Sequence, residues 1–305
     1  MEEIKSLGQL AEQVKASGTK TRIAVAAAED AHTLDALGRA VKEGFVRASL
    51  IGDKRRIEEL CAKENLCQGD FEIIDRPDET AAVNMAVQMV KTGNADAVMK
   101  GLVSTDKFLK AVIHKEKGLL LPKAVMSHVC VLEIPAYRKL LFISDTAVLP
   151  FPDLDQKAAM INYCVNVARG FGIEKPRVAL VSATDKVIGA IPNTLEYALL
   201  AKMAERGQIK NCVIDGPLDI FLACDPSSLA VKGVDTPIAG NADILIFPNL
   251  ECSNSFYKGL MLFADGELAG LIQGTQKPVI VMSRSESALS KYYSIALACK
   301  MGMEK

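Results

Sequence analysis

The 305-residue sequence contains no tryptophan and carries no strong charge of either sign. Its 36 Lys and Arg residues nearly balance 37 Asp and Glu residues, which leaves a formal net charge of -1. A nucleic-acid-binding protein usually presents a basic stripe, and we find none in the sequence. No apolar run reaches the roughly 18 residues expected of a membrane span. We therefore expect neither a nucleic acid nor a membrane as partner.

The sequence also lacks the short motifs that mark several large enzyme classes. It contains no G-x-G-x-x-G and no G-x-x-x-x-G-K-[ST] segment, so the usual sequence motifs of dinucleotide-binding and NTP-binding proteins are absent. No H-E-x-x-H metal motif and no G-x-S-x-G nucleophile elbow occur. Eight scattered cysteines form no C-x-x-C pair, which predicts reduced thiols, no zinc site and a cytoplasmic location. The amphipathic segment 1–18 has no apolar signal core, so we do not expect export.

Half of the residues are apolar, which is enough for a sizeable core in one large unit or in two domains. Short β-branched runs alternate with helical patterns, and this alternation predicts an α/β fold with a mostly parallel sheet. The predicted strands are 22–27, 48–52, 71–75, 97–101, 129–134, 140–144, 177–182, 212–215, 244–248 and 278–282. The predicted helices include 30–43, 53–63, 79–91, 106–115, 155–169, 194–206 and 286–300.

The segment Pro150-Phe151-Pro152-Asp153 interrupts the pattern near the middle of the chain. Proline disfavours helix at the residue before it, so we expect an extended segment here. A helix and a second βα series follow, and the last helix is predicted to return to the first half. We therefore predict one lobe from 1–150 plus 271–305 and a second from 151–270, with an active site in the cleft between them.

Hydroxyl, small and charged residues follow several of the predicted strands. In open α/β sheets, ligands bind beyond the carboxyl ends of the strands. Phosphate prefers backbone N–H groups, hydroxyls and cations, so this composition suits an anion site. The residues in question include Gly101, Ser104, Thr105, Ser144, Asp145, Ser283, Arg284 and Glu286.

Local structure offers a second explanation for some of these residues. The segment Gly101–Asp106 could be a turn followed by a helix N-cap. Ser283-x-x-Glu286 fits a capping box, which by itself would account for both residues. A cap does not account for Arg284, so this residue is the stronger candidate for function.

Several segments, taken in order, resemble one enzyme family. They are Lys100–Leu109, Gly240–Glu251, Asn254 with Tyr257-Lys258, Gln273-Gly274, Lys277-Pro278-Val279 and Ser283-Arg284. Together they resemble the phosphate acetyl/butyryltransferase family, and its butyryltransferase branch most closely. The resemblance covers nearly the whole chain, and several segments in one order are more specific than any single motif.

The resemblance implies a three-layer, two-lobed fold of the isocitrate/isopropylmalate dehydrogenase type, usually as a homodimer or larger homo-oligomer. It implies reversible transfer of a short acyl group, here butyryl, between CoA and inorganic phosphate. The partners would be CoA, acyl phosphate and phosphate, with CoA as a substrate and with no metal and no permanently bound cofactor.

The resemblance also assigns site residues. Ser283 and Arg284 are the catalytic pair: the serine hydroxyl would bond the reacting centre, and the guanidinium would hold phosphate or the oxyanion through two parallel N–H bonds. Lys110 takes the place of an arginine that acetyltransferases use near CoA. The substrate-binding set is Lys100, Gly101, Ser104, Thr105, Lys110, Ser127, Asn254, Tyr257, Lys258 and Gly274.

The general base is left open by the sequence. Acetyltransferase members carry an Asp seven residues after the catalytic Ser, and that position is Ser290 here. Glu286 and Asp145 are the candidate replacements, and a third alternative is that the thiol needs no strong base.

Two other functions stay possible on the same fold. An NAD-dependent, metal-requiring dehydrogenase would need clustered acidic ligands, and one D-x-x-x-D pair occurs, at Asp215 and Asp219. Gly216 and Pro217 lie between these two residues, so we do not expect them to share a helix face. A non-catalytic CoA or acyl-phosphate binding protein would need no catalytic pair, and the presence of Ser283 and Arg284 speaks against it.

Overall fold

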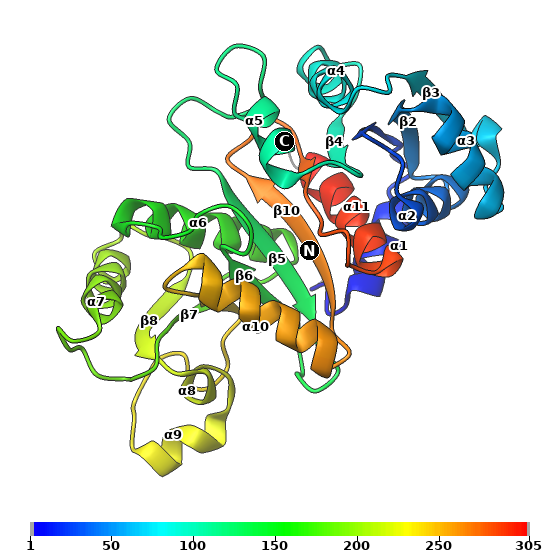
Figure 1. Cartoon of the computed structure of the whole chain (residues 1–305). Coiled ribbons are helices and arrows are strands. Elements are labelled where there is room, and N and C mark those ends of the chain that lie inside the picture. Colours follow the sequence, from blue (N-terminus) through cyan, green and yellow to red (C-terminus); the bar gives the residue numbers. More distant parts are fainter. Residues whose placement is uncertain (1–2, 304–305) are drawn as a thin grey trace. The chain divides into compact units, whose positions relative to one another are not determined.

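The computed structural model describes residues 3–303 and divides into two compact units (Figure 1). The terminal unit comprises Leu7–Met126 and 268–303, and the central unit comprises 3–6 and 127–267. Residues 127–150, which we expected in the first lobe, thus group with the central unit. The amphipathic segment 1–18 contains helix α1 (Leu7–Ala16). Residues 1–2 of that segment lie outside the described part of the chain.

The terminal unit is built on a mostly parallel sheet. Its strands are β1 (Thr21–Ala26), β2 (Val46–Gly52), β3 (Phe71–Asp75), β4 (Ala97–Lys100), β10 (Glu267–Gln273) and β11 (Val279–Ile280). Their order is β3-β2-β1-β4-β11-β10, and only the β11-β10 pair is antiparallel. Its helices are α2 (Ala31–Lys42), α3 (Lys54–Lys63), η1 (Gln68–Asp70), α4 (Glu79–Lys91), α5 (Thr105–Val112) and α11 (Ala288–Met303), together with α1.

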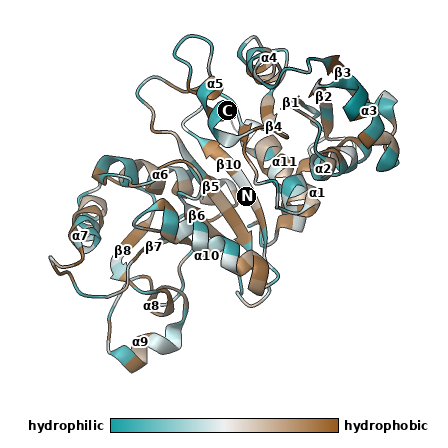
Figure 2. Cartoon of the chain, in the orientation of Figure 1, coloured by the Kyte–Doolittle hydropathy of each residue, from teal (hydrophilic) through white to brown (hydrophobic). Residues whose placement is uncertain are grey.

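Helices cover both faces of this sheet. Helix α11 packs against α1 and α2, and α4 packs on β1 with α5 beside it. The strands are apolar and the outer helix faces polar, as the brown and teal ribbons of Figure 2 show. In α2, for example, Leu34 and Leu37 are fully buried one turn apart. Burial of such apolar stripes drives the layered packing.

The central unit repeats the α/β design. Its strands are β5 (Ser127–Glu133), β6 (Leu141–Ser144), β7 (Arg177–Val181), β8 (Val213–Leu218) and β9 (Ile244–Ile246), in the order β5-β6-β9-β7-β8. Only the β5-β6 pair is antiparallel. Its helices are α6 (Leu154–Gly170), α7 (Pro192–Glu205), α8 (Ile220–Cys224), α9 (Pro226–Lys232) and α10 (Leu250–Phe263).

The proline-rich segment before α6 is irregular, as expected, and it ends in a helix cap. The Asp153 carboxylate accepts a 2.8 Å hydrogen bond from Gln156 N, and the Gln156 side chain accepts one of 2.9 Å from Asp153 N. This reciprocal pair is a capping box, which satisfies backbone donors that the first turn would leave unpaired. The helix therefore begins where the proline constraint ends.

The predicted α/β class and the mostly parallel sheet are confirmed, and all ten predicted strands are present. Strand β10 and helices α8 to α10 were not among the predicted elements. Helix α11 begins at Ala288 rather than at Glu286. Only a short turn with Gly274 at a positive φ of 84° separates β10 from β11, so the alternation with helices fails there.

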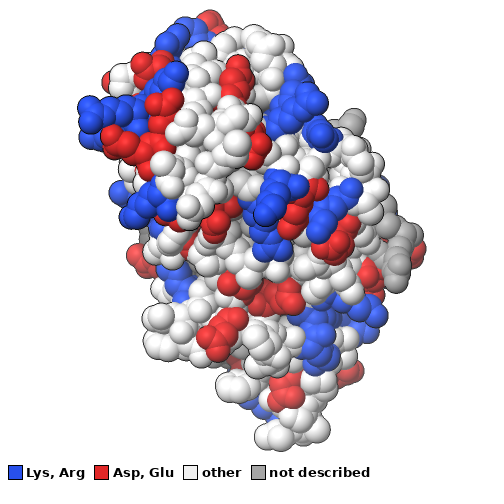
Figure 3. Space-filling model, turned by 90° about the vertical axis from the view of Figure 1, so that its right-hand side faces the viewer, with Lys and Arg blue, Asp and Glu red and all other residues white. Residues whose placement is uncertain are grey.

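Positive and negative side chains are intermixed on the face drawn in Figure 3, in keeping with the balanced net charge. Within residues 3–303, every helix is too short or too polar to cross a lipid bilayer.

Candidate functional site

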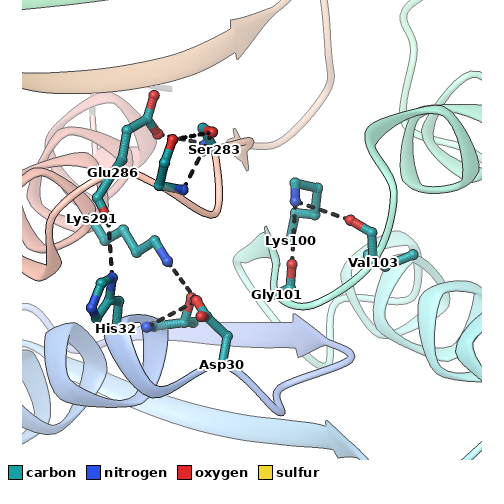
Figure 4. A network of polar contacts seen from close by, with 10 residues as sticks. Asp30, His32, Lys100, Gly101, Val103, Ser283, Glu286 and Lys291 are labelled. Atoms are coloured by element: carbon teal, nitrogen blue, oxygen red, sulfur yellow. Dashed lines mark hydrogen bonds and ion pairs between the residues drawn. The ribbon is translucent and has the colours of Figure 1, made fainter.

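Three parallel strands of the terminal unit, β1, β4 and β11, end side by side. Ala26 of β1 is opposite Lys100 of β4, and Met99 is opposite Ile280 of β11. The segments that follow these strands therefore meet at one edge of the sheet, where ligands bind in open α/β folds. Figure 4 shows the polar network that results.

Lys100 is the last residue of β4, and only 4% of it is exposed. Its Nζ donates hydrogen bonds of 3.2 Å to Gly101 O and 3.1 Å to Val103 O. Burial, followed by the positive charges of Lys291 and Arg284, lowers the pKa of Lys100 to about 8. Lys100 can therefore change its charge near neutral pH, unlike a lysine in water.

Gly101 allows two loops to touch. A Cβ at this position would lie 2.1 Å from the backbone oxygen of Ala27, closer than any real contact. Gly101 N donates to Ala26 O at 2.9 Å, and Leu102 N donates to Ala27 O at 2.6 Å. Only glycine fits this approach of the β4 loop to the β1 loop.

Ser104 serves as the N-cap of α5, because its Oγ accepts a hydrogen bond of 3.4 Å from Lys107 N. The local explanation of this serine is thus confirmed. Its predicted contact with substrate, like that of Thr105 in the first turn of α5, stays a prediction.

The turn after β11 brings Ser283, Arg284 and Glu286 together. The Glu286 carboxylate accepts a 2.5 Å hydrogen bond from Ser283 N, and the Ser283 hydroxyl lies 3.0 Å from that of Ser285. The arrangement is not the capping box of α11, because that helix begins at Ala288. Arg284 is exposed and lies close enough to act electrostatically on Lys100.

Ser287 supplies the cap that we had expected of Ser283. Its Oγ accepts a 2.9 Å hydrogen bond from Ser290 N in the first turn of α11. The Ser283–Glu286 turn is therefore not needed to cap the helix, which leaves Ser283 and Arg284 to be explained by function.

Lys291 and Asp30 form a buried ion pair that sequence reasoning missed. Lys291 Nζ lies 2.5 Å from the Asp30 carboxylate, which also caps α2 by accepting a 3.2 Å hydrogen bond from Thr33 N. Burial by itself would raise the pKa of Asp30, but the hydrogen bonds from Lys291 and Thr33 outweigh it, and the pKa is lowered. In the sequence, Asp30 was only the first residue of the predicted helix 30–43, and nothing marked Lys291.

The position that carries an aspartate in acetyltransferases has a structural use here. Ser290 is fully buried, and its Oγ accepts a 3.1 Å hydrogen bond from Leu268 N of β10. It is thus turned toward the sheet and holds the start of a strand.

Asp145 lies in the central unit and is engaged through both carboxylate oxygens. One accepts a 3.0 Å hydrogen bond from His128 N, and the other accepts bonds of 2.7 and 2.8 Å from Ala147 N and Val148 N. These three backbone donors shape the loop after β6. A base in this position would have to give up part of that support.

Helix α10 is attached to the same loop. Asn254 Nδ2 donates a 2.9 Å hydrogen bond to Thr146 O, and the Ser253 hydroxyl donates to Asp145 O. Tyr257 is buried one turn further along, and its neighbour Lys258 is exposed. The predicted Asn254, Tyr257 and Lys258 are thus on one helix whose start is fixed to the β6 loop.

Two further predicted substrate-binding residues are Ser127, at the start of β5, and Gly274, which follows β10. The Ser127 hydroxyl is buried, 3.0 Å from that of Ser144 at the end of β6. Gly274 follows β10, and its carbonyl oxygen accepts a 3.0 Å hydrogen bond from Leu121 N.

Lys110 lines a hollow between α4 and α5. The hollow has a volume of about 310 Å³, and its lining includes Thr80, Asn84, Lys107 and His114. Lys107 pairs with Glu79 at 2.8 Å. Val83 and Ala111 also line the hollow, and its accessible wall is mostly apolar, with nitrogen-bearing side chains from Lys107, Lys110 and His114.

The chain is similar to known proteins over most of its length. The family model described as phosphate acetyl/butaryl transferase matches residues 78–299. The chain is 41% identical over 302 residues to a phosphate butyryltransferase of Clostridium acetobutylicum, covering 99% of this chain and 100% of that protein. It is 39% identical over 292 residues to a phosphate acetyltransferase of Thermotoga maritima, covering 96% and 98%.

A solved structure has the same fold. The crystal structure of a branched-chain phosphotransacylase from Enterococcus faecalis V583 superposes with a TM-score of 0.81 at 27% identity, covering 92% of this chain and 99% of that one. The family match spans well over half of the chain and includes the β4 and β11 loops described above. This chain therefore belongs to the phosphate acetyl/butaryl transferase family.

Proposed function

We propose that this chain catalyses the reversible reaction acyl-CoA + phosphate = acyl phosphate + CoA, with butyryl as the preferred acyl group. The observation that carries the proposal is the charge at the ends of β4 and β11. When Lys100 is protonated, the three cations Lys100, Arg284 and Lys291 outnumber the two carboxylates Asp30 and Glu286 that act on Lys100, which leaves one positive charge in excess. A partly buried cation without a counter-ion is unfavourable, so the cluster suits an anion such as phosphate.

Arg284 and Ser283 take the catalytic roles. An exposed guanidinium can present two parallel N–H groups to phosphate or to the oxyanion that forms on the carbonyl. The Ser283 hydroxyl would donate to the same reacting centre. Gly101 lets the β4 loop lie against the β1 loop, and the first turn of α5 at Ser104 and Thr105 offers N–H groups to phosphate.

The remaining substrate contacts are assigned to residues held by the elements described above. From the central unit these are Ser127, Asn254, Tyr257 and Lys258, and from the terminal unit Lys100 and Gly274. Much of the rate would come from holding two substrates in register.

Of the two candidate carboxylate bases, Glu286 fits better than Asp145. Glu286 lies in the cluster that contains Arg284, whereas Asp145 accepts three backbone hydrogen bonds.

The hollow between α4 and α5 is our proposed contact for CoA. CoA carries several phosphate charges, and Lys110 supplies positive charge there, whereas the charge of Lys107 is paired with Glu79. A lysine acts on phosphate as a point charge, without the fork geometry of arginine.

We further propose a homodimer or larger homo-oligomer, a cytoplasmic location, and no metal or permanently bound cofactor. Leu262 and Phe263 at the end of α10 are 74% and 85% exposed, and exposed apolar residues of this kind favour an interface. We also propose the isocitrate/isopropylmalate dehydrogenase type of fold, which the two mostly parallel α/β units support.

A thiol-release assay tests the function. The protein is mixed with butyryl-CoA and phosphate, and free thiol and acyl phosphate are measured in equal amounts. Binding of CoA without turnover would instead indicate a binding protein. Turnover that needs NAD and stops with a chelator would indicate the dehydrogenase.

A further inference from the structure

Lys100 has the hydrogen-bond partners that an uncharged amine needs. A neutral amine has two hydrogens and one lone pair, whereas an ammonium has three hydrogens. The carbonyls of Gly101 and Val103 accept two hydrogen bonds from Nζ, which satisfies both hydrogens of the neutral form. The lone pair is then the position where a proton can be taken up or released.

Two other buried lysines of the chain are held differently. Lys157 and Lys291 each form an ion pair with a carboxylate, Glu196 and Asp30 respectively. None of the ion pairs within residues 3–303 includes Lys100. Lys100 is therefore a buried lysine whose charge is not fixed by a paired carboxylate.

The charged groups around Lys100 come from three neighbouring elements. Lys291 on α11 and Arg284 before that helix oppose its positive charge, whereas Asp30 before α2 and Glu286 after β11 favour it. Burial acts in the same direction as the two cations and is the largest effect, so the pKa falls to about 8. A thiol in water has a pKa of about 8.5, so a proton can pass between the two groups at little cost in free energy.

We propose that Lys100 carries the proton between the sulfur of CoA and phosphate, an inference that rests on the function proposed above. Ser290 and Asp145 are both used to hold backbone N–H groups, and Glu286, the better of the two carboxylate candidates, likewise accepts a 2.5 Å hydrogen bond from Ser283 N, so we assign the proton transfer to Lys100 instead. Figure 4 shows Lys100 and the Ser283–Glu286 turn in one view without a hydrogen bond drawn between them, and the charges of Arg284 and Glu286 act on Lys100.

In the direction of acyl phosphate formation, a phosphate oxygen attacks the thioester carbonyl and forms the new C–O bond. The C–S bond then breaks, and the sulfur leaves with the bonding electron pair and takes a proton from the Lys100 ammonium. The neutral amine next takes the proton that hydrogen phosphate releases on becoming acyl phosphate. Protons and charge balance, and in the reverse direction neutral Lys100 takes the proton of the thiol.

The test is the pH dependence of kcat with butyryl-CoA and phosphate as substrates. In this direction the thioester has no thiol proton, so a fall in kcat above pH of about 8 reports the proton donor of the enzyme. We expect Lys100→Met to lower kcat about 100-fold or more and to remove this fall.

Lys100→Arg separates proton transfer from charge. Arginine keeps the positive charge but does not release its proton in this pH range. We expect kcat to stay about 100-fold low in Lys100→Arg, while the KM for phosphate stays near that of the wild type. Recovery of kcat in this variant would show that Lys100 acts by charge only and would overturn the proposal.

Two control variants accompany these measurements. Lys157→Met removes another buried lysine, whose partners lie in α7 and the α6 cap, and should keep the pH profile of the wild type. Glu286→Gln should keep the fall in kcat near pH 8. If the fall is lost in Glu286→Gln and persists in Lys100→Met, the carboxylate is the donor and the proposal is wrong.

A measurement without substrate separates this inference from the proposed function. NMR of protein labelled with ¹³C at the lysine side chains should show a signal that titrates near pH 8 and is missing from Lys100→Met. If the wild type turns over no acyl-CoA, both the proposed function and the proposed role of Lys100 are wrong, even when the lysine signal titrates near pH 8. Normal turnover in a folded Lys100→Met protein would contradict the proposed role of Lys100 and leave the proposed function intact.

Discussion

Lys291 of α11 donates a 2.5 Å hydrogen bond to the carboxylate of Asp30, a residue 261 positions earlier in the chain. The pair joins the first turn of the last helix to the N-terminus of α2. Both residues act on Lys100, one against its positive charge and one in favour of it. A contact between two helices thus helps to set the charge of a residue at the end of β4.

Removing the cation of this pair should destabilise the protein. In Lys291→Met the Asp30 carboxylate loses its partner while its side chain stays only 15% exposed. Breaking a buried pair in this way costs about 3 kcal/mol or more. Urea unfolding of the variant should show this loss, and the double variant Lys291→Met with Asp30→Asn should recover part of it. Equal stability of Lys291→Met and the wild type would mean that the pair contributes nothing.

Gly101→Ala should damage the β4 loop. The added Cβ would overlap the Ala27 backbone oxygen, which cannot move without shifting β1 and its neighbours. We expect a loss of about 2 kcal/mol in unfolding free energy, together with reduced turnover. Gly259→Ala is the matched control, because nothing lies within 4 Å of its added Cβ in α10. That change should be neutral or slightly stabilising, since alanine favours helix.

Arg284→Ala should reduce catalysis with little effect on stability. The side chain is exposed, so its removal should change unfolding free energy by a few tenths of a kcal/mol. If it holds phosphate or the oxyanion, the loss in transition-state binding is about 3 kcal/mol, or two orders of magnitude in rate. Arg284→Lys should also be poor, because one ammonium does not make two parallel bonds. Ser283→Ala should be milder. Near-normal kinetics in Arg284→Ala would remove this residue from the mechanism.

Butyryl-CoA should be a better substrate than acetyl-CoA. The two extra methylenes are worth roughly 0.8 kcal/mol each when buried, which corresponds to about a tenfold preference in kcat/KM. Steady-state kinetics with acyl-CoA esters of increasing length check this. A clear preference for acetyl-CoA would contradict the butyryl assignment and leave the family assignment intact.

The sequence alone was sufficient for most of the secondary structure. Strand β3 and helix α4 have the predicted bounds, because a period of two or 3.6 residues is a local property. Helix α10 was not predicted, and of its residues only Ser253 and Tyr257 are buried. Strand β10 was missed because it turns back into β11 without a helix between them.

For the candidate site too, some features were predictable from the sequence and others were determined only by the tertiary structure. The order of motifs was enough to name the family and to single out Ser283 and Arg284. Local pattern alone would have made Ser283 a helix cap, and only the folded chain shows Ser287 in that role. The Asp30–Lys291 pair and the lowered pKa of Lys100 were decided by tertiary structure. Both depend on burial and on distances between charges from separate elements, which spacing along the sequence does not contain.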